Sequence, residues 1–111
     1  MNKKTVLITG SSTGFGRATA KLFAEKGWNV VATMRDVPAA GDLAERDNVL
    51  VSRLDVTDPA TIEQAIRTSI DHFGKLDAVI NNAGYGHQYG ISSSAWLRSR
   101  GDAEKSEFLI Y

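Results

Sequence analysis

A short apolar run that leads into three closely spaced glycines constrains the fold of this chain more than any other feature. Residues 5–9, TVLIT, are β-branched and apolar without polar alternation, which predicts a strand buried on both faces. Gly10, Gly14 and Gly16 follow. A helical pattern then begins, with apolar residues at spacings of three and four: Phe15, Ala18, Leu22 and Phe23. A strand, a glycine-rich turn and a helix are therefore expected in that order.

The same alternation of strand and helix continues along the chain. Apolar runs predict three more strands, at residues 29–34, 49–55 and 77–81. A short helix is expected within residues 42–47, DLAERD. A longer helix follows a cap at Thr57 or Asp58, with Pro59 in its first turn, and Gly74 ends it. Its apolar face consists of Ile62, Ala65, Ile66, Ile70 and Phe73.

This series predicts an α/β fold, namely a partial Rossmann fold with a doubly wound parallel sheet and helices on both faces. Right-handed crossovers give the strand order 3-2-1-4, and ligands bind such sheets where the order reverses, beyond the carboxyl ends of the strands. The glycine turn and an Asn-Asn-Ala-Gly turn after the fourth strand both belong there. Residues 1–86 are expected to form this half-domain, and residues 87–111 an irregular tail.

Length and composition exclude several other classes of protein. A chain of 111 residues with 42% hydrophobic and 23% charged residues suits one soluble globular domain. Its formal net charge is zero, which gives no electrostatic basis for binding nucleic acid or an anionic membrane. It has no cysteine, and neither His72 nor His87 has convergent partners, so no metal site is predicted. The N-terminal apolar run is too short for a secretory or membrane segment, and a cytoplasmic location is expected.

The three glycines suit a turn that binds a pyrophosphate. Gly10 lets the strand turn sharply, the missing side chain at Gly14 lets the backbone approach a ligand, and Gly16 lets the helix pack tightly on the sheet. The helix N-terminus then offers unpaired N–H groups and the positive end of its dipole to an anion. A flexible loop that happens to contain three glycines is the alternative. It does not account for the strand before the turn and the helix after it.

Three motifs in this order resemble the short-chain dehydrogenase/reductase family. They are Thr-Gly-x-x-x-Gly-x-Gly at residues 9–16, Asp55-Val56 after the third strand and Asn-Asn-Ala-Gly at residues 81–84. The segment HFGKLDAVINNAG, which ends on the third motif, resembles the family's fourth-strand segment almost throughout. The resemblance runs from Lys4 to about Gly86. It implies binding of NAD(P)(H), with hydride transfer between this cofactor and an alcohol or carbonyl substrate as the family's reaction.

The resemblance also assigns roles to individual residues. Four residues of the glycine turn would line the pyrophosphate and ribose: Gly10, Ser12, Phe15 (through its backbone N–H) and Gly16. Asp55 would accept a hydrogen bond from the adenine amino group, beside the Val56 backbone. Taken alone, Asp55 is equally an aspartate that begins a turn. The turn after the fourth strand would shape the floor near the adenosine ribose: Asn81, Asn82, Ala83 and Gly84.

The end of the second predicted strand bears on the choice of cofactor. NAD users need a carboxylate there for the ribose 2′-hydroxyl, whereas an arginine suits the 2′-phosphate of NADP. Met34 occupies the acidic position and Arg35 follows, and a guanidinium can bind phosphate through two hydrogen bonds. NADP(H) is therefore favoured. NAD(H) stays open, because Arg35 could be simply solvated, Asp36 adds a negative charge, and Thr13 lacks the basic side chain that some NADP users carry.

The residues on which the family's hydride transfer depends cannot be placed in this chain. They are a serine after the fifth strand, a Tyr-x-x-x-Lys pair on the next helix and an asparagine before that strand. The tyrosines are Tyr85, Tyr89 and Tyr111, and none is followed four residues later by lysine. The serines at 92–94 come too soon after the fourth strand. We therefore predict no catalytic residue and an inactive chain, although the resemblance is to an oxidoreductase.

The tail after Gly86 departs from the family, because it lacks the apolar spacing of the long helix expected there. A lost reading frame or a truncated gene would explain the change. The fourth strand would then have an unpaired apolar edge through which the chain could self-associate. Two other interpretations stay open: a non-catalytic dinucleotide-binding module, and a product without function. The substrate cannot be predicted, because the family's pocket is built mostly from the half that this sequence does not match.

Overall fold

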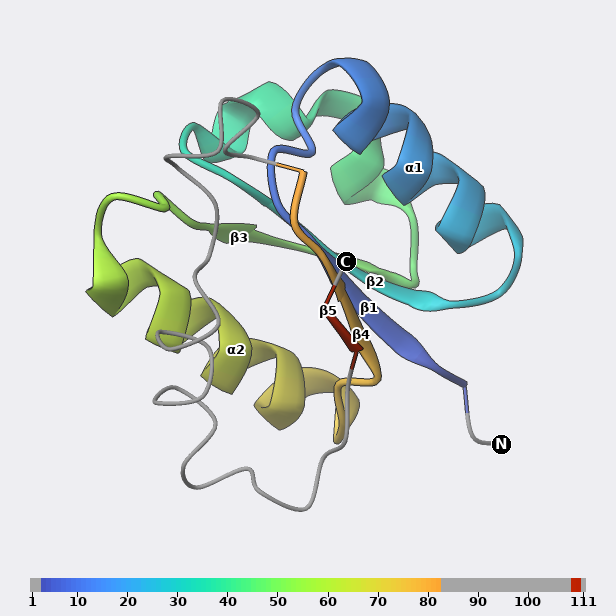
Figure 1. Ribbon diagram of the computed structural model, residues 1–111. Coiled ribbons are helices and arrows are strands. Elements are labelled where there is room, and N and C mark those ends of the chain that lie inside the picture. Colours follow the sequence, from blue (N-terminus) through green and yellow to red (C-terminus); the bar gives the residue numbers. More distant parts are fainter. Residues whose placement is uncertain (1–2, 83–108, 111) are drawn as a thin grey trace.

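The computed structural model describes residues 3–82 and 109–110, which form a parallel sheet with helices on both faces (Figure 1). In chain order the elements are β1 (Thr5–Ile8), α1 (Gly14–Glu25), β2 (Asn29–Met34), the 3-10 helix η1 (Val37–Glu45), β3 (Val49–Arg53), α2 (Pro59–Phe73), β4 (Ala78–Ile80) and β5 (Leu109–Ile110). The elements from β1 to β4 follow the predicted series, so the α/β Rossmann-type fold is confirmed. The short helix η1 begins earlier than expected and bends at Gly41.

All strand pairs of the sheet are parallel, and the strand order is β3-β2-β1-β4-β5. The predicted order 3-2-1-4 is confirmed. The expectation of an unpaired edge on β4 is wrong, because Leu109 and Ile110 pair there with Ala78 and Val79. Backbone groups along an apolar edge need hydrogen-bond partners, and a short segment from far along the chain supplies some of them. The C-terminal tail is thus not irregular throughout.

Each face of the sheet has its own apolar core, because alternate residues of a strand point to opposite sides. Figure 1 shows α1 and η1 over one face and α2 over the other. The core under α1 and η1 consists of Val6, Ile8, Ala20, Ala24, Val30, Ala32, Met34, Ala40, Leu43 and Val49. The core under α2 consists of Leu7, Val31, Leu54, Ile62, Ala65, Ile66, Leu76 and Val79. Burial on both sides explains the unbroken apolar runs of the strands.

The buried face of α1 consists of small residues. Three residues spaced by four are buried in this helix: Gly16, Ala20 and Ala24. Of the residues whose spacing indicated the helix, Phe23 packs partly against the core, whereas Phe15 is 80% exposed and Leu22 is 53% exposed. The spacing predicted the helix correctly but did not identify the face that packs. A helix that lies this close to a sheet has room only for small side chains at the contact.

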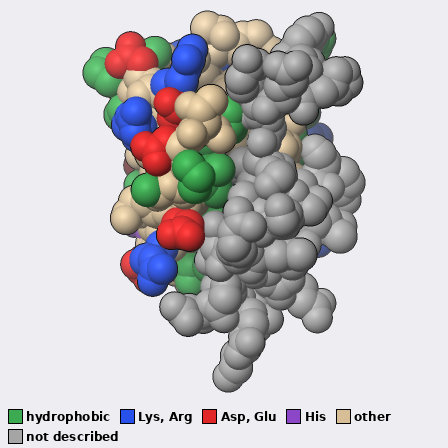
Figure 2. All heavy atoms as spheres, turned by 60° about the vertical axis from the view of Figure 1, so that its left-hand side comes forward, with side chains coloured by type: hydrophobic (Ala, Val, Ile, Leu, Met, Phe, Trp, Pro, Cys, Tyr) green, Lys and Arg blue, Asp and Glu red, His purple; other side chains and the backbone are tan. Residues whose placement is uncertain are grey.

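The ends of α2 follow the sequence signals. The carboxylate of Asp58 caps the helix and accepts a hydrogen bond from the Ala60 N–H (3.1 Å), and Pro59 follows in the first turn. Gly74 ends the helix with a left-handed backbone, at φ 84°. No helix among the described residues is long and apolar enough to cross a membrane. On the face shown in Figure 2, acidic and basic side chains of the described residues are interspersed.

Candidate functional site

The carboxyl ends of the parallel strands bring four of the predicted segments to one edge of the sheet (Figure 1). They are the glycine turn after β1, Arg35 after β2, Asp55 after β3, and Asn81 and Asn82 after β4. Backbone hydrogen bonds join neighbouring segments. The Ser11 N–H donates to the Thr33 carbonyl (3.0 Å), and the Leu54 N–H donates to the Met34 carbonyl (2.9 Å). Motifs that are far apart in the sequence thus form one continuous edge.

Hydrogen bonds hold one side of the glycine turn to the sheet, and the other side is open at Gly14. Gly10 and Gly14 have left-handed backbone angles, at φ 65° and 59°, which glycine adopts without steric cost. Ser11 is fully buried, and its hydroxyl donates to the Ile8 carbonyl (2.8 Å). The Thr33 hydroxyl donates to the same carbonyl (2.8 Å). By contrast, a Cβ atom on Gly14 would meet no atom of the described residues within 4 Å. A ligand can therefore approach the backbone at Gly14.

Gly16 lies so close to Gly10 that no side chain fits between them. A Cβ atom on Gly16 would lie 1.9 Å from the Gly10 carbonyl oxygen and 2.8 Å from the side-chain nitrogen of Asn82. That nitrogen donates a hydrogen bond to the same Gly10 oxygen (3.3 Å). Beside it, the Thr9 hydroxyl donates to Oδ1 of Asn81 (3.2 Å). The two asparagines after β4 therefore hold the turn that follows β1.

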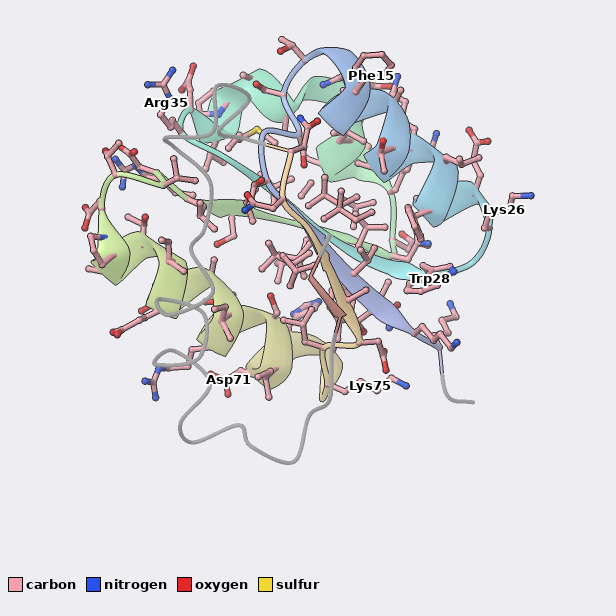
Figure 3. The ribbon with its side chains drawn as sticks, in the orientation of Figure 1. Phe15, Lys26, Trp28, Arg35, Asp71 and Lys75 are labelled. Carbon is pink, nitrogen blue, oxygen red and sulfur yellow. The ribbon has the colours of Figure 1, made fainter. Side chains whose placement is uncertain are left out.

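The N-terminus of α1 points its unpaired N–H groups toward this edge. Thr13 is the N-cap residue but makes no side-chain capping bond, and the first turn contains no acidic residue. The side chain of Phe15 projects outward from this turn, which leaves its backbone N–H at the helix end (Figure 3). The first N–H groups of a helix have no partner within the helix, and the dipole makes this end positive. Such an end suits an anion.

Arg35 presents the charged group at the end of β2. Its side chain is exposed and points away from the sheet (Figure 3). Met34, at the position where a carboxylate would mark NAD use, is 3% exposed and belongs to the core under α1 and η1. A group bound at this edge can therefore contact the guanidinium of Arg35 but not the side chain of Met34.

Asp55 forms the turn after β3 as well as part of the edge. Its Oδ1 accepts hydrogen bonds from the N–H (3.0 Å) and the hydroxyl (2.6 Å) of Thr57. These bonds lower the pKa of the Asp55 carboxyl, and the charges of Arg35 and Arg53 add to the effect. The other oxygen, Oδ2, has no hydrogen-bond partner among the described residues. Val56 packs partly against the core under α2, which fixes the backbone next to Asp55.

Arg17 belongs to this edge but was not among the predicted residues. It lies in the first turn of α1, donates to the Ser12 carbonyl (3.4 Å) and the Ala40 carbonyl (3.0 Å), and forms an ion pair with Asp42 of η1. One signal in the sequence pointed to it. A cation in the first turn of a helix opposes the dipole, so an arginine there needs other partners.

Some predictions lie beyond the part of the chain that the structure describes. Ala83, Gly84 and the tail from residue 87 to residue 108 are outside the described residues, as are the three tyrosines. Among residues 3–82 and 109–110, no group of three or more His, Asp or Glu side chains could hold a metal ion. The chemistry available at the described edge is that of anion binding by backbone N–H groups. The exposed guanidinium groups of Arg35 and Arg53 and the carboxylate of Asp55 lie beside them.

Comparison with known proteins gives matches along most of the chain. Residues 4–99 match the family model described as short chain dehydrogenase, so the match continues past Gly86. An uncharacterized oxidoreductase of Schizosaccharomyces pombe is 45% identical over 82 residues, which is 74% of this chain. The 15-hydroxyprostaglandin dehydrogenase [NAD(+)] of Bos taurus is 35% identical over 95 residues, or 79% of this chain. A crystal structure of a short-chain dehydrogenase from Streptomyces avermitilis is 36% identical, covers 74% of this chain and superposes with a TM-score of 0.69.

The chain spans about a third of the length of these proteins: 27% of the yeast oxidoreductase, 36% of the bovine dehydrogenase and 31% of the Streptomyces chain. The matched part contains the glycine turn, the strand order β3-β2-β1-β4 and the asparagines after β4. Sequence, topology and turn geometry therefore agree. The chain belongs to the short-chain dehydrogenase family.

Proposed function

We propose that this chain is the NAD(P)(H)-binding portion of a short-chain dehydrogenase, and that it prefers NADP(H). The observation that carries the proposal is the open backbone at Gly14, the first residue of α1. The N-cap Thr13 makes no side-chain capping bond, and this end of the helix lies on the same edge as Arg35 and Asp55. A dinucleotide needs an anion site for its pyrophosphate and polar groups on either side of it. This edge offers both.

The pyrophosphate and its riboses would lie over the glycine turn. The residues that would line them are Gly10, Ser12, Gly14, Phe15 and Gly16, with Phe15 acting through its backbone N–H. The free Oδ2 of Asp55 would accept from the adenine amino group, beside the backbone of Val56. The floor near the adenosine ribose would consist of Asn81, Asn82, Ala83 and Gly84. The hydrogen bond from Asn82 to Gly10 supports this arrangement, because it fixes the floor to the turn.

Arg35 supports the preference for NADP(H). It is exposed directly after β2, and a guanidinium can bind a 2′-phosphate through two hydrogen bonds. Met34 is buried, so the side chain at the position of the NAD-specific carboxylate is out of reach of a ribose. The bovine relative carries NAD(+) in its name, and NAD(H) is therefore the competing cofactor.

Titration with NADPH and NADH, followed by the fluorescence of the reduced nicotinamide, tests the proposal. Arg35→Ala should weaken NADPH binding by roughly 10- to 100-fold, because a hydrogen bond to a charged group is lost, and should leave NADH binding nearly unchanged. Arg67→Ala, which removes an exposed arginine on α2, is the matched control. Equal affinities of the parent and Arg35→Ala for NADPH would overturn the preference.

A second pair of variants tests the glycine turn. Gly14→Asp and Gly14→Asn have side chains of almost the same size, and both residue types tolerate a left-handed backbone better than most. Gly14→Asp should abolish binding of both dinucleotides, because its charge repels the pyrophosphate. Gly14→Asn should bind more weakly than the parent but better than Gly14→Asp. If both bind like the parent, the pyrophosphate does not lie over this turn.

The reaction of the family is hydride transfer between the cofactor and an alcohol or carbonyl substrate. We expect this chain by itself to bind the cofactor without turnover, because it contains no Tyr-x-x-x-Lys pair. Oxidation or reduction of any alcohol or carbonyl by the purified chain would refute that expectation.

A further inference from the structure

The guanidinium of Arg17 joins three segments that surround the proposed dinucleotide site. Its Nη1 atom donates to the carbonyls of Ser12 (3.4 Å), Ala39 (3.5 Å) and Ala40 (3.0 Å), and its Nη2 atom pairs with the carboxylate of Asp42. Ser12 belongs to the glycine turn, Arg17 to α1, and the other three residues to η1. One side chain therefore connects the turn, the helix that follows it and the segment beyond β2.

The shape of η1 fits around this side chain. Gly41 interrupts the 3-10 helix with φ 56° and ψ −126°, angles that are not helical. The bend leaves the carbonyls of Ala39 and Ala40 and the side chain of Asp42 all directed at the guanidinium. A Cβ atom on Gly41 would lie 3.5 Å from Nη2 of Arg17, so the backbone of η1 passes directly against it.

Ion pairs with Asp42 also hold η1 to α1 at this position. Lys21, one turn further along α1, also pairs with Asp42 (3.3 Å). A hydrogen bond from Lys21, with the charges of Lys21 and Arg17, lowers the pKa of the Asp42 carboxyl. Asp42 thus stays ionised near neutral pH and offsets the unfavourable placement of Arg17 at the positive end of the helix.

The contact with Ser12 also orients the peptide on which the proposed site depends. In a trans peptide the carbonyl and the following N–H point in opposite directions. A Ser12 carbonyl that faces Arg17 therefore turns the Thr13 N–H to the other side, away from the guanidinium. In addition, η1 begins only two residues after Arg35, so the same side chain restrains the backbone that carries the group proposed for the 2′-phosphate.

We propose that Arg17 is a positioning residue, which fixes the glycine turn and the segment between β2 and η1 relative to one another and so sets the affinity for the dinucleotide. This inference rests on the proposed function. Arg17 does not contact the cofactor in this scheme. It acts through the Ser12–Thr13 peptide, which serves NAD(H) and NADP(H) alike, and through the backbone next to Arg35.

Arg17→Met tests the inference, because methionine keeps the length of the side chain and removes its donors and charge. NADPH and NADH should both bind roughly tenfold more weakly, since a charged hydrogen-bond donor that orders the site is lost. Arg46→Met is the matched control. Arg46 follows η1 and pairs with Glu25 of α1 (3.7 Å), so it joins the same two helices at the end remote from the glycine turn. The affinities of Arg46→Met for NADPH and NADH should equal those of the parent.

Amide hydrogen exchange without cofactor gives an independent measurement. Exchange in residues 10–16 and 36–45 should be faster in Arg17→Met than in the parent, and unchanged in Arg46→Met. If Arg17→Met does not fold, Arg17→Lys replaces it. Lysine keeps the charge, but one ammonium group cannot reach both Ser12 and Asp42, and a loss of about threefold in both affinities is expected.

Four results would overturn the inference or part of it. Unchanged affinities in a folded Arg17→Met that melts earlier would limit Arg17 to stability. A loss confined to NADPH would make Arg17 a direct ligand of the 2′-phosphate. A parent chain that binds neither dinucleotide would refute both the proposed function and the role of Arg17 in affinity. Unchanged amide hydrogen exchange in Arg17→Met would refute only the restraint of the glycine turn by Arg17.

Discussion

Replacing Gly16 with alanine should destabilise the protein far more than a typical glycine-to-alanine change. The added Cβ would lie 1.9 Å from the carbonyl oxygen of Gly10, which is about 1 Å closer than real Cβ contacts allow. The obstacle is backbone, so a side-chain rotation cannot relieve it. Either α1 must move away from the sheet, or the glycine turn must shift and lose the hydrogen bond from Asn82 to Gly10.

The expected cost follows from these contacts. Overpacking by one methyl group in a tight site costs about 1–3 kcal/mol, and loss of the Asn82 hydrogen bond adds about 1 kcal/mol. The better helix propensity of alanine returns about 1 kcal/mol. Together these terms lower the free energy of unfolding by about 1–3 kcal/mol. The upper part of that range is expected because the obstacle is rigid backbone, and it corresponds to a drop of roughly 10–20 °C in the melting temperature of a domain of this size.

Thermal and urea unfolding followed by circular dichroism measure this drop. Gly74→Ala is the matched control, because Gly74 has a left-handed backbone at φ 84° but a Cβ there would meet no described atom within 4 Å. It should cost only about 1 kcal/mol, from backbone strain. In Asn82→Ala, the change Gly16→Ala should remain severe, since the Gly10 oxygen is still in place. If Gly16→Ala is as mild as Gly74→Ala, the close approach of α1 to the turn is refuted.

Two further predictions concern the Asp42 ion pairs and the β5 edge. A hydrogen bond from Lys21 holds the pKa of Asp42 below its ordinary 3.8. The ion pairs of Asp42 therefore stabilise the folded state fully above pH 3.8, and this stabilisation is lost as the pH falls through the lowered pKa of the folded state. The melting temperature of Asp42→Asn should therefore lie below the parent's at neutral pH and approach it in acid, and a gap that persists unchanged below pH 3.8 would contradict this. Deletion of residues 109–111 should uncover the edge of β4 and increase self-association in sedimentation velocity, because β5 pairs with that edge. A sedimentation profile identical to the parent's would rule this out.

Much of the fold could be predicted because its signals are local. The strands are buried on both faces, so they are continuous apolar runs, and the cap at Asp58 and the stop at Gly74 lie next to the helix that they bound. That the turns after the strands lie side by side could also be predicted, from the strand order. Once the order of four parallel strands is known, the turns after them must meet at one edge.

The predictions that were wrong or incomplete all concern how separate elements pack against one another. The buried face of α1 depends on how closely the helix approaches the sheet, and that closeness exposes Phe15 and Leu22. The pairing of β5 with β4 joins segments about 30 positions apart through only two residues, too few for any periodicity. Arg17 was missed because its partners on η1 lie more than twenty positions away.

The sequence by itself determined the order of strands and helices, the glycine-rich turn and the residues at the strand ends. These depend on backbone angles and periodicities that neighbouring residues impose on one another. Only the tertiary structure decided which face of α1 packs, what covers β4 and what the first-turn arginine binds. Those outcomes depend on the space left between elements, and that space exists only after the elements have packed.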